Sequence, residues 1–389
     1  MLPTEPQTVE ALLNEAYALP QGHAARLELM ESAVRLADSL NDLEAGWETR
    51  DELMDEATMS GRPEKTLVAF SWNLAQFDRV GDQYGWDEYD LLWKYKWVLN
   101  SLADFPQIAD AQIEAAISDF ASRLERAGYS PRTVYYLHAK REHKRGDFKK
   151  ADALRALWSD AEDDDMSDCS ACEAAFNVEY LASTGRNAEA LEAAKPILSG
   201  RMRCAEVPHT TLADLLEPML ALGKLEEAVS AHLRGYKMIS DNQEFLVSSG
   251  LHLAFLAYTH NLPEAVKLLE RHLPWALETA VPGSRSAFYR AVLVLLRRLR
   301  DAGETSLQFR APPEFGLQPG ADGFNLETLE AHLRADLTAT AQAFDARNGT
   351  SAYRDAIEPD AALLKNVSFV SLEERRTESL EKKSSKRKI

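Results

Sequence analysis

Four turns recur along the chain at near-constant spacing, and this repeat restricts the fold more than any other feature. Each turn begins with glycine or histidine and reaches an alanine five residues later. The four segments are Gly146-Asp-Phe-Lys-Lys-Ala151, Gly185-Arg-Asn-Ala-Glu-Ala190, Gly223-Lys-Leu-Glu-Glu-Ala228 and His260-Asn-Leu-Pro-Glu-Ala265. Their alanines lie 39, 38 and 37 residues apart. A repeat with a period of about 20 to 50 residues is typical of a stacked array, so we expect each segment to mark one repeating unit.

The residues between the turns show helical spacing. Along residues 26–37, apolar side chains recur at Leu27, Met30, Val34 and Ala37, three or four positions apart, which places them in one stripe of a helix. No stretch shows the alternation of a half-buried strand. A single helix pair cannot bury its apolar stripe alone, so neighbouring pairs must stack. The sequence therefore predicts an all-α fold, a solenoid of antiparallel helix pairs.

At these turns the chain resembles the tetratricopeptide repeat (TPR) family. In that family an aromatic residue or leucine follows the turn glycine by two residues, as Phe148, Leu225 and Leu262 follow their turns here. An alanine three residues further on belongs to the second helix of each pair. Asn187 departs from this pattern, and the period exceeds the family's repeat of about 34 residues.

The resemblance extends well over residues 130–280 and loosely over residues 1–128. It implies a right-handed superhelical stack in which the first helix of each pair lines a concave face. Such a face would bind a protein or peptide partner, and the alignment with the family puts five candidate partner-binding residues on it: Tyr136, Lys140, His143, Glu179 and Glu217. Positive charge at one place and negative charge further along would orient an extended peptide.

The repeats divide the chain into four parts. We expect divergent helical repeats over 1–128, TPR-like repeats over 129–281 and a C-terminal helical cap over 282–372. The cap contains an irregular loop at 306–324, which is rich in proline and glycine. The last part, 373–389, is polar and carries five positive and no negative charges from Lys382 onward, so we expect a flexible basic tail.

Charge and composition narrow the possible functions. The chain has 44 lysine and arginine residues against 62 aspartate and glutamate residues, a formal net charge of −18. Because an acidic surface repels phosphate groups, this balance argues against nucleic acid as a partner. No apolar run approaches the roughly 20 residues that cross a bilayer, and the N-terminus lacks a signal-peptide pattern. With only three cysteines, the chain is predicted to be cytoplasmic, with no membrane partner.

The three cysteines form the strongest local motif. Cys169 and Cys172 are two residues apart in a CxxC arrangement, and Cys204 and His209 follow at the corresponding place in the next repeat. Three thiolates and an imidazole make a Cys3His set that can hold a tetrahedral zinc ion. Four protein ligands would leave no open position, so such an ion would be structural. Simple packing of small side chains explains the motif equally well, and redox chemistry is a third alternative.

Two further clusters have a functional and a structural interpretation. Residues 47–97 contain five of the chain's seven tryptophans, which would serve either core packing or a partner-binding groove. Around the first repeat turn, a group of basic residues would either be solvated or attract an acidic partner. This basic group consists of Lys140, Arg141, His143, Lys144, Arg145, Lys149 and Lys150.

These observations favour an interaction scaffold over an enzyme. None of the phosphate-binding, zinc-protease or serine-hydrolase motifs is present in the sequence. The leading prediction is a non-enzymatic, TPR-like scaffold that holds a peptide or protein partner. One alternative is a regulatory sensor that closes around a small peptide or metabolite. Another is a metal-dependent enzyme, which would require an open coordination position.

Overall fold

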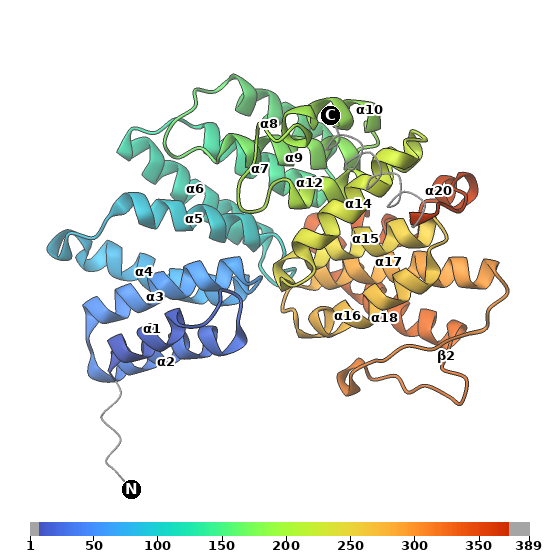
Figure 1. Cartoon of the computed structure of the whole chain (residues 1–389). Coiled ribbons are helices and arrows are strands. Elements are labelled where there is room, and N and C mark those ends of the chain that lie inside the picture. Colours follow the sequence, from blue (N-terminus) through green and yellow to red (C-terminus); the bar gives the residue numbers. More distant parts are fainter. Residues whose placement is uncertain (1–7, 373–389) are drawn as a thin grey trace, which may run out of the picture. The chain divides into compact units, whose positions relative to one another are not determined.

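Nearly all of the secondary structure is helical (Figure 1). The structure is a computed structural model that describes residues 8–372. The chain forms two compact units. Unit 1 runs as far as Ser167 and takes in the short segments Asn242–Glu244 and Thr279–Val281, and unit 2 takes the rest. The prediction of an all-α fold built from helix pairs is therefore confirmed, while the right-handedness of the stack stays a prediction.

Unit 1 is a series of long helices, each packed against the next along the chain. These are α1 (Val9–Tyr17), α2 (Ala24–Leu40), α3 (Leu43–Met59), α4 (Pro63–Tyr84), α5 (Glu88–Leu102), α6 (Asp110–Ala127), α7 (Arg132–Arg145) and α8 (Phe148–Asp160). The apolar stripes of α1 to α7 meet in one core that contains Met54, Phe70, Leu92 and Phe120, each no more than 2% exposed. Helix α8 packs against α7 and buries Ala151 and Trp158 outside this core.

Unit 2 contains helices of very unequal length, from 4 to 23 residues, and a small pair of strands. The helices are α9 (Ser170–Ser183), α10 (Asn187–Ala193), α11 (Lys195–Leu198), α12 (His209–Asp214), α13 (Leu216–Ala221), α14 (Leu225–Ile239), α15 (Leu246–Tyr258), α16 (Leu262–Glu278), α17 (Pro282–Asp301), α18 (Leu326–Asn348), α19 (Ala352–Asp355) and α20 (Ala361–Asn366). The strands β1 (Ser306–Leu307) and β2 (Phe324–Asn325) pair antiparallel, with Ser306 opposite Asn325. The 3-10 turn η2 (Pro313–Phe315) also belongs to unit 2, whereas η1 (Gln243–Phe245) begins in the unit 1 segment Asn242–Glu244 and ends in unit 2.

Helix α15 lies at the centre of unit 2, beside α16 and α17 (Figure 1). It approaches α17 closely at Gly250, where an added Cβ would lie 3.2 Å from the Cα of Phe288. Most of the side chains of α15 are buried, including Leu253 and Phe255 at 0% exposure. A side chain at residue 250 would therefore require α17 to give way by a few tenths of an ångström.

The four predicted turns all occur between helices. Gly146, Gly185, Gly223 and His260 have φ angles of 78°, 73°, 69° and 57°, in the left-handed region that glycine adopts without strain. They separate α7 from α8, α9 from α10, α13 from α14, and α15 from α16. The alanines that follow are all 0% exposed: Ala151, Ala190, Ala228 and Ala265. The repeat therefore marks a turn followed by a helix whose first buried position admits only a small side chain.

The predicted parts differ from the observed units in their boundaries. The break expected after residue 128 falls inside unit 1, which continues to Ser167. The loop predicted at 306–324 begins and ends in the two short strands and holds η2 between them. The predicted tail, 373–389, lies outside the described residues.

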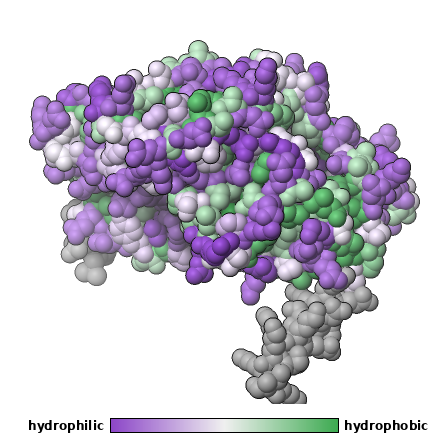
Figure 2. All heavy atoms as spheres, turned by 90° about the horizontal axis from the view of Figure 1, so that it is seen from above, coloured by the Kyte–Doolittle hydropathy of each residue, from purple (hydrophilic) through white to green (hydrophobic). Residues whose placement is uncertain are grey.

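The described helices include none that combines the length and apolar character needed to cross a membrane. The face shown in Figure 2 is mainly hydrophilic, with smaller hydrophobic patches between the polar side chains. This surface agrees with the large excess of acidic residues in the sequence.

Candidate functional site

Three cysteine side chains meet at the start of α9. Cys169 is the N-cap of this helix, and its Sγ accepts a hydrogen bond from the backbone N–H of Cys172 at 3.3 Å. The Sγ of Cys172 lies 3.1 Å from that of Cys169 and 3.3 Å from that of Cys204. All three sulfur atoms lie within 4.8 Å of one another, so the cluster could hold a metal ion.

The loop between α11 and α12 brings Cys204 to this helix start. The backbone N–H of Cys204 donates to the carbonyl of Val207 at 3.0 Å, which turns the loop back on itself. Cys204 also packs against a small apolar cluster formed by Ala171, Ala175, Ile197 and Val207. The first two thiols are therefore placed by helix capping, whereas the third depends on tertiary packing.

The three thiols are a donor set that soft cations bind, but only after the thiols have lost their protons. Burial raises the pKa of the Cys172 thiol, and its contacts with Cys169 and Cys204 raise it further. Because metals bind the thiolate, an ion would have to displace these protons. Zinc binds sulfur at about 2.3 Å, which sets the sulfur atoms of a tetrahedral site about 3.8 Å apart. The thiols would need to separate by less than about 1 Å to reach that geometry.

His209 does not join the three thiols. Among the described residues, the metal-binding cluster contains the cysteines alone. The imidazole of His209, at the start of α12, stacks instead on the ring of Phe245, with 5.7 Å between ring centroids. Its Nδ1 is buried and has no hydrogen-bond partner within residues 8–372. The structure thus gathers three of the four predicted ligands, and a tetrahedral ion would need its fourth ligand from elsewhere.

Unit 2 also contains an acidic hollow, which we define by two adjoining cavities of about 420 Å³ and about 350 Å³. Glu217, Leu251 and Asp360 line both cavities. The smaller one is also lined by Glu179 and Asp214, so both predicted carboxylates of the concave face open onto the same hollow. Alanine and leucine side chains supply much of the remaining wall.

Two carboxyl groups of this acidic hollow are perturbed by their surroundings. Burial raises the pKa of Asp214 well above its usual range, and the nearby charge of Glu179 raises it further. Burial also raises the pKa of Glu217, although the guanidinium of Arg290 acts in the opposite direction. Within the part of the chain that the structure describes, neither Asp214 nor Glu217 forms a side-chain hydrogen bond or ion pair.

Arg290, on α17, is the one guanidinium that lines the larger cavity. Its Nη1 donates to the carbonyl of Ala356 at 3.3 Å, while its Nε is buried without a partner among the described residues. Burial lowers the pKa of this guanidinium. Arg290 therefore lines the hollow together with Glu217, and its charge acts on that carboxyl group.

The other predicted partner-binding residues lie on α7 in unit 1. Tyr136 is only 2% exposed and its ring packs against that of Trp158, with centroids 5.0 Å apart. The ammonium of Lys140 lies over the Tyr136 ring at 5.1 Å. His143 contacts the ring of Phe148. Tyr136 is therefore buried within unit 1, whereas Lys140 and His143 are half-buried.

The basic group around the first turn is largely neutralised. Arg141 binds Asp110 at 2.7 Å and Glu114 at 2.6 Å, and it is only 5% exposed. Lys144 binds Asp104 at 2.7 Å, in the loop that precedes α6. These acidic residues lie far from the turn in sequence, and their ion pairs neutralise much of the positive charge that the sequence around the turn suggests.

The tryptophans of residues 47–97 form stacked clusters on unit 1. Trp86 precedes α5 and stacks on Trp47 with 4.1 Å between ring centroids. Trp93 lies within α5 and packs beside Tyr89. Each of these three tryptophans is half-buried, so the rings contribute to packing and retain some exposed surface.

Sequence reasoning missed Asp214 and Arg290. Asp214 precedes Glu217 by three residues, a spacing that places two side chains on the same side of a helical segment, so the signal was present. Arg290 belongs to the predicted cap helix, and no local pattern links it to the repeats. No protein-family model and no curated protein matches this chain.

Proposed function

We propose that this protein is a non-enzymatic interaction scaffold whose unit 2 holds a basic segment of a protein or peptide partner in the acidic hollow. The observation that carries the proposal is that Asp214 and Glu217 line this hollow and neither forms a direct ion pair within the described residues, although the charge of Arg290 acts on Glu217. A carboxylate taken out of water is costly unless a cation or a donor compensates it. A lysine or arginine side chain of a partner would supply that compensation.

Further features of the molecule support a basic, extended partner. Arg290 can donate to a backbone carbonyl of the bound segment, which would fix the segment relative to the carboxylates. The apolar wall around Leu251 and Ala254 suits the methylene stem of lysine or arginine. The net charge of −18 would speed the approach of a basic partner, and salt would weaken this effect.

A lysine tetrapeptide tests the proposal directly. We expect it to bind the wild-type protein, and a glutamate tetrapeptide to bind far more weakly. Replacing both Asp214→Asn and Glu217→Gln should lower the affinity for the lysine peptide at least about tenfold, or about 1.4 kcal/mol, because neither amide can ionise to pair with a lysine ammonium, while the side-chain volume is nearly unchanged. Isothermal titration calorimetry at low ionic strength would measure it.

The matched control is Glu304→Gln, which removes an exposed acidic charge of unit 2 outside the acidic hollow. This variant should bind the lysine tetrapeptide almost as well as the wild type. Equal affinities for the double variant and the wild type would contradict the proposal. So would preference for the glutamate tetrapeptide.

We propose in addition that Cys169, Cys172 and Cys204 hold one zinc ion. Such an ion would tie the start of α9 to the loop before α12. It would leave one coordination position to an added ligand, for which the exposed Cys169 side gives access. Native mass spectrometry of protein purified without chelators should show one zinc per chain, lost in Cys172→Ser and retained in the neighbouring Ser170→Ala. Equal metal content in the two variants would exclude the site.

A further inference from the structure

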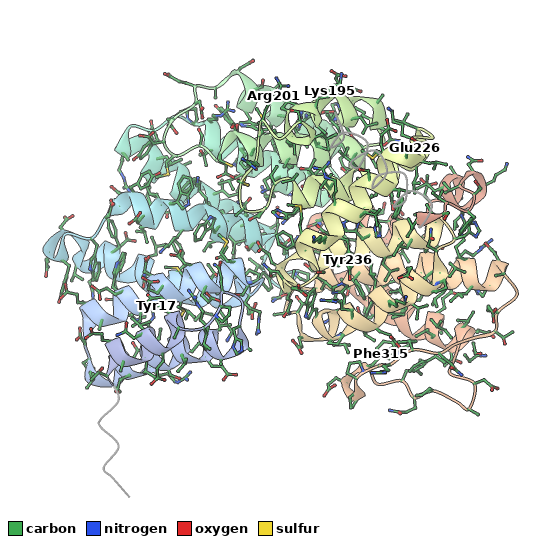
Figure 3. The ribbon with its side chains drawn as sticks, viewed as in Figure 1. Tyr17, Lys195, Arg201, Glu226, Tyr236 and Phe315 are labelled. Atoms are coloured by element: carbon green, nitrogen blue, oxygen red, sulfur yellow. The ribbon has the colours of Figure 1, made fainter. Side chains whose placement is uncertain are left out.

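Unit 2 contains another cavity, of about 520 Å³, that is separate from both the cysteines and the acidic hollow. Its polar wall comes from His232 and Tyr236 on α14, and Figure 3 marks Tyr236 on this helix. Leu233, Leu256 and Leu268 supply apolar surface. The turn from His260 to Glu264 and the chain segment after α20 form the remaining wall. A hydrogen bond from the N–H of Val370 to the carbonyl of Thr259, 3.2 Å long, holds this segment in place.

Behind the polar wall, His252 contacts His232, and this contact determines which ring nitrogen of each histidine carries the proton. The Nδ1 atoms of His232 and His252 lie 3.0 Å apart, so one of them must carry the proton. His252 is 0% exposed, and its Nε2 has no partner among the described residues. A buried N–H without an acceptor is rarer than an unused lone pair. His252 therefore carries its proton on Nδ1 and donates to His232, which leaves the proton of His232 on Nε2.

The same reasoning assigns the proton in the second pair, Tyr236 and His272. The hydroxyl of Tyr236 lies 2.9 Å from Nε2 of His272, which is also 0% exposed. The Nδ1 of His272 is buried without a partner among the residues described. Keeping the unused atom as a lone pair puts the proton on Nε2, so His272 donates to the oxygen of Tyr236. The hydroxyl proton of Tyr236 is then free to donate elsewhere.

Each pair thus leaves one hydrogen-bond donor for the cavity, Nε2–H of His232 from the first pair and O–H of Tyr236 from the second. The wall of the cavity carries little net charge. Burial lowers the pKa of His232 to about 3 and that of His272 to about 4, so both imidazoles are neutral at pH 7. Burial also lowers the pKa of His260 at the rim. Arg271, whose charge acts on His272, is paired with Asp241, and Arg298, whose charge acts on His260, donates to the backbone carbonyls of Leu364 and Tyr258. Glu264, at the rim, binds Lys267 at 2.7 Å.

We infer that this cavity binds an uncharged small molecule with an apolar body and a carbonyl oxygen that accepts hydrogen bonds from His232 Nε2–H and Tyr236 O–H. A hydrocarbon of the same size would leave both donors unsatisfied. A carboxylate would lose its hydration without meeting a cation. This inference does not depend on the acidic hollow, because the two sites share no lining residue.

Three matched probes separate these chemistries: the ketone benzylacetone, the hydrocarbon butylbenzene and the carboxylate hydrocinnamate. Saturation-transfer NMR at pH 7 on the full chain would rank their affinities. We expect benzylacetone to bind about tenfold more tightly than either of the others, the effect of roughly one or two hydrogen bonds. Tyr236→Phe should reduce binding of benzylacetone to the level of butylbenzene and leave butylbenzene unchanged.

Tyr289→Phe serves as the control, because it removes the hydroxyl of another buried tyrosine of unit 2 that does not line this cavity. It should bind all three probes like the wild type. Long-range ¹H–¹⁵N NMR of the histidine rings should also show His232 protonated on Nε2 and His252 on Nδ1. The inference is overturned by equal binding of ketone and hydrocarbon, by preference for the carboxylate, by the absence of binding, or by the opposite tautomers.

Discussion

Single ionisable side chains of unit 2 respond to pH in opposite directions. Burial lowers the pKa values of His232 and His272 below the usual 6.5. At a pH between the folded pKa and about 6.5, the unfolded chain binds more protons than the folded protein. The stability that these neutral rings contribute is therefore fully present above about pH 6.5 and is lost as the pH falls toward the folded pKa. Burial raises the pKa values of Asp214 and Glu217. Their contribution is present at low pH and is lost as the pH rises through the folded pKa.

Replacing His272 by glutamine should make the protein less sensitive to acid. Each buried histidine contributes a loss of up to about 1.4 kcal/mol per pH unit below about pH 6.5, and glutamine can still donate to Tyr236 but does not titrate. Urea unfolding between about pH 7 and about pH 5 should therefore show a shallower fall in unfolding free energy for His272→Gln. The exposed His23 is a suitable control, because His23→Asn preserves the N-cap of α2. A slope equal to that of the wild type in His272→Gln would refute the assignment.

At the scale of elements, the turns could be predicted from the sequence because each depends on local residues. Glycine suits the left-handed turn position, and alanine suits the buried position of the helix that follows. A left-handed φ and a fully buried small side chain occur at the predicted places in all four repeats. The two-residue strands could not be predicted, since they are too short to show alternation. The break between α12 and α13 at Leu215 does have a local cause in the sequence, because Pro218 lacks the N–H that would bond to the carbonyl of Asp214.

Substitutions at two turn glycines can separate the energetic cost of backbone strain from the cost of a steric clash. Gly223 and Gly61 have similar φ angles of 69° and 67°, but only Gly61 is crowded. A Cβ at residue 61 would lie 2.8 Å from the Cα of Glu244, whereas nothing lies within 4 Å of one at residue 223. Gly223→Ala should cost about 1 kcal/mol from strain alone, and Gly61→Ala clearly more. Thermal unfolding measures both, and similar losses would show that the contact at Gly61 is unimportant.

At the scale of the molecule, the repeat pattern does not reveal the division into two units. The turns at Gly146 and Gly185 look alike in sequence, yet they fall in different units, because tertiary contacts and not the period decide where packing is interrupted. The candidate metal centre could likewise be predicted only in part from the sequence. Helix capping places the CxxC pair, while spacing alone cannot fix the direction of the His209 ring, which turns to Phe245.

The distribution of tryptophan makes it possible to observe the two units separately. Of the seven tryptophans only Trp275 lies in unit 2, so in Trp275→Phe the fluorescence reports unit 1 alone, whereas far-ultraviolet circular dichroism reports the helices of both. If zinc joins the three thiols, a chelator should lower the part of the dichroism transition that belongs to unit 2. The shift should be about 2–4 °C for each kcal/mol of metal-derived stability.

The fluorescence transition of Trp275→Phe should stay where it is, because all three cysteines belong to unit 2. Adding zinc back should restore the dichroism transition in this variant, but not after Cys204→Ser is introduced. A chelator that moved both transitions equally would mean that the two units unfold together. Unchanged transitions in both signals would mean that the thiols contribute to packing alone, which is the other interpretation that the cysteine spacing allows.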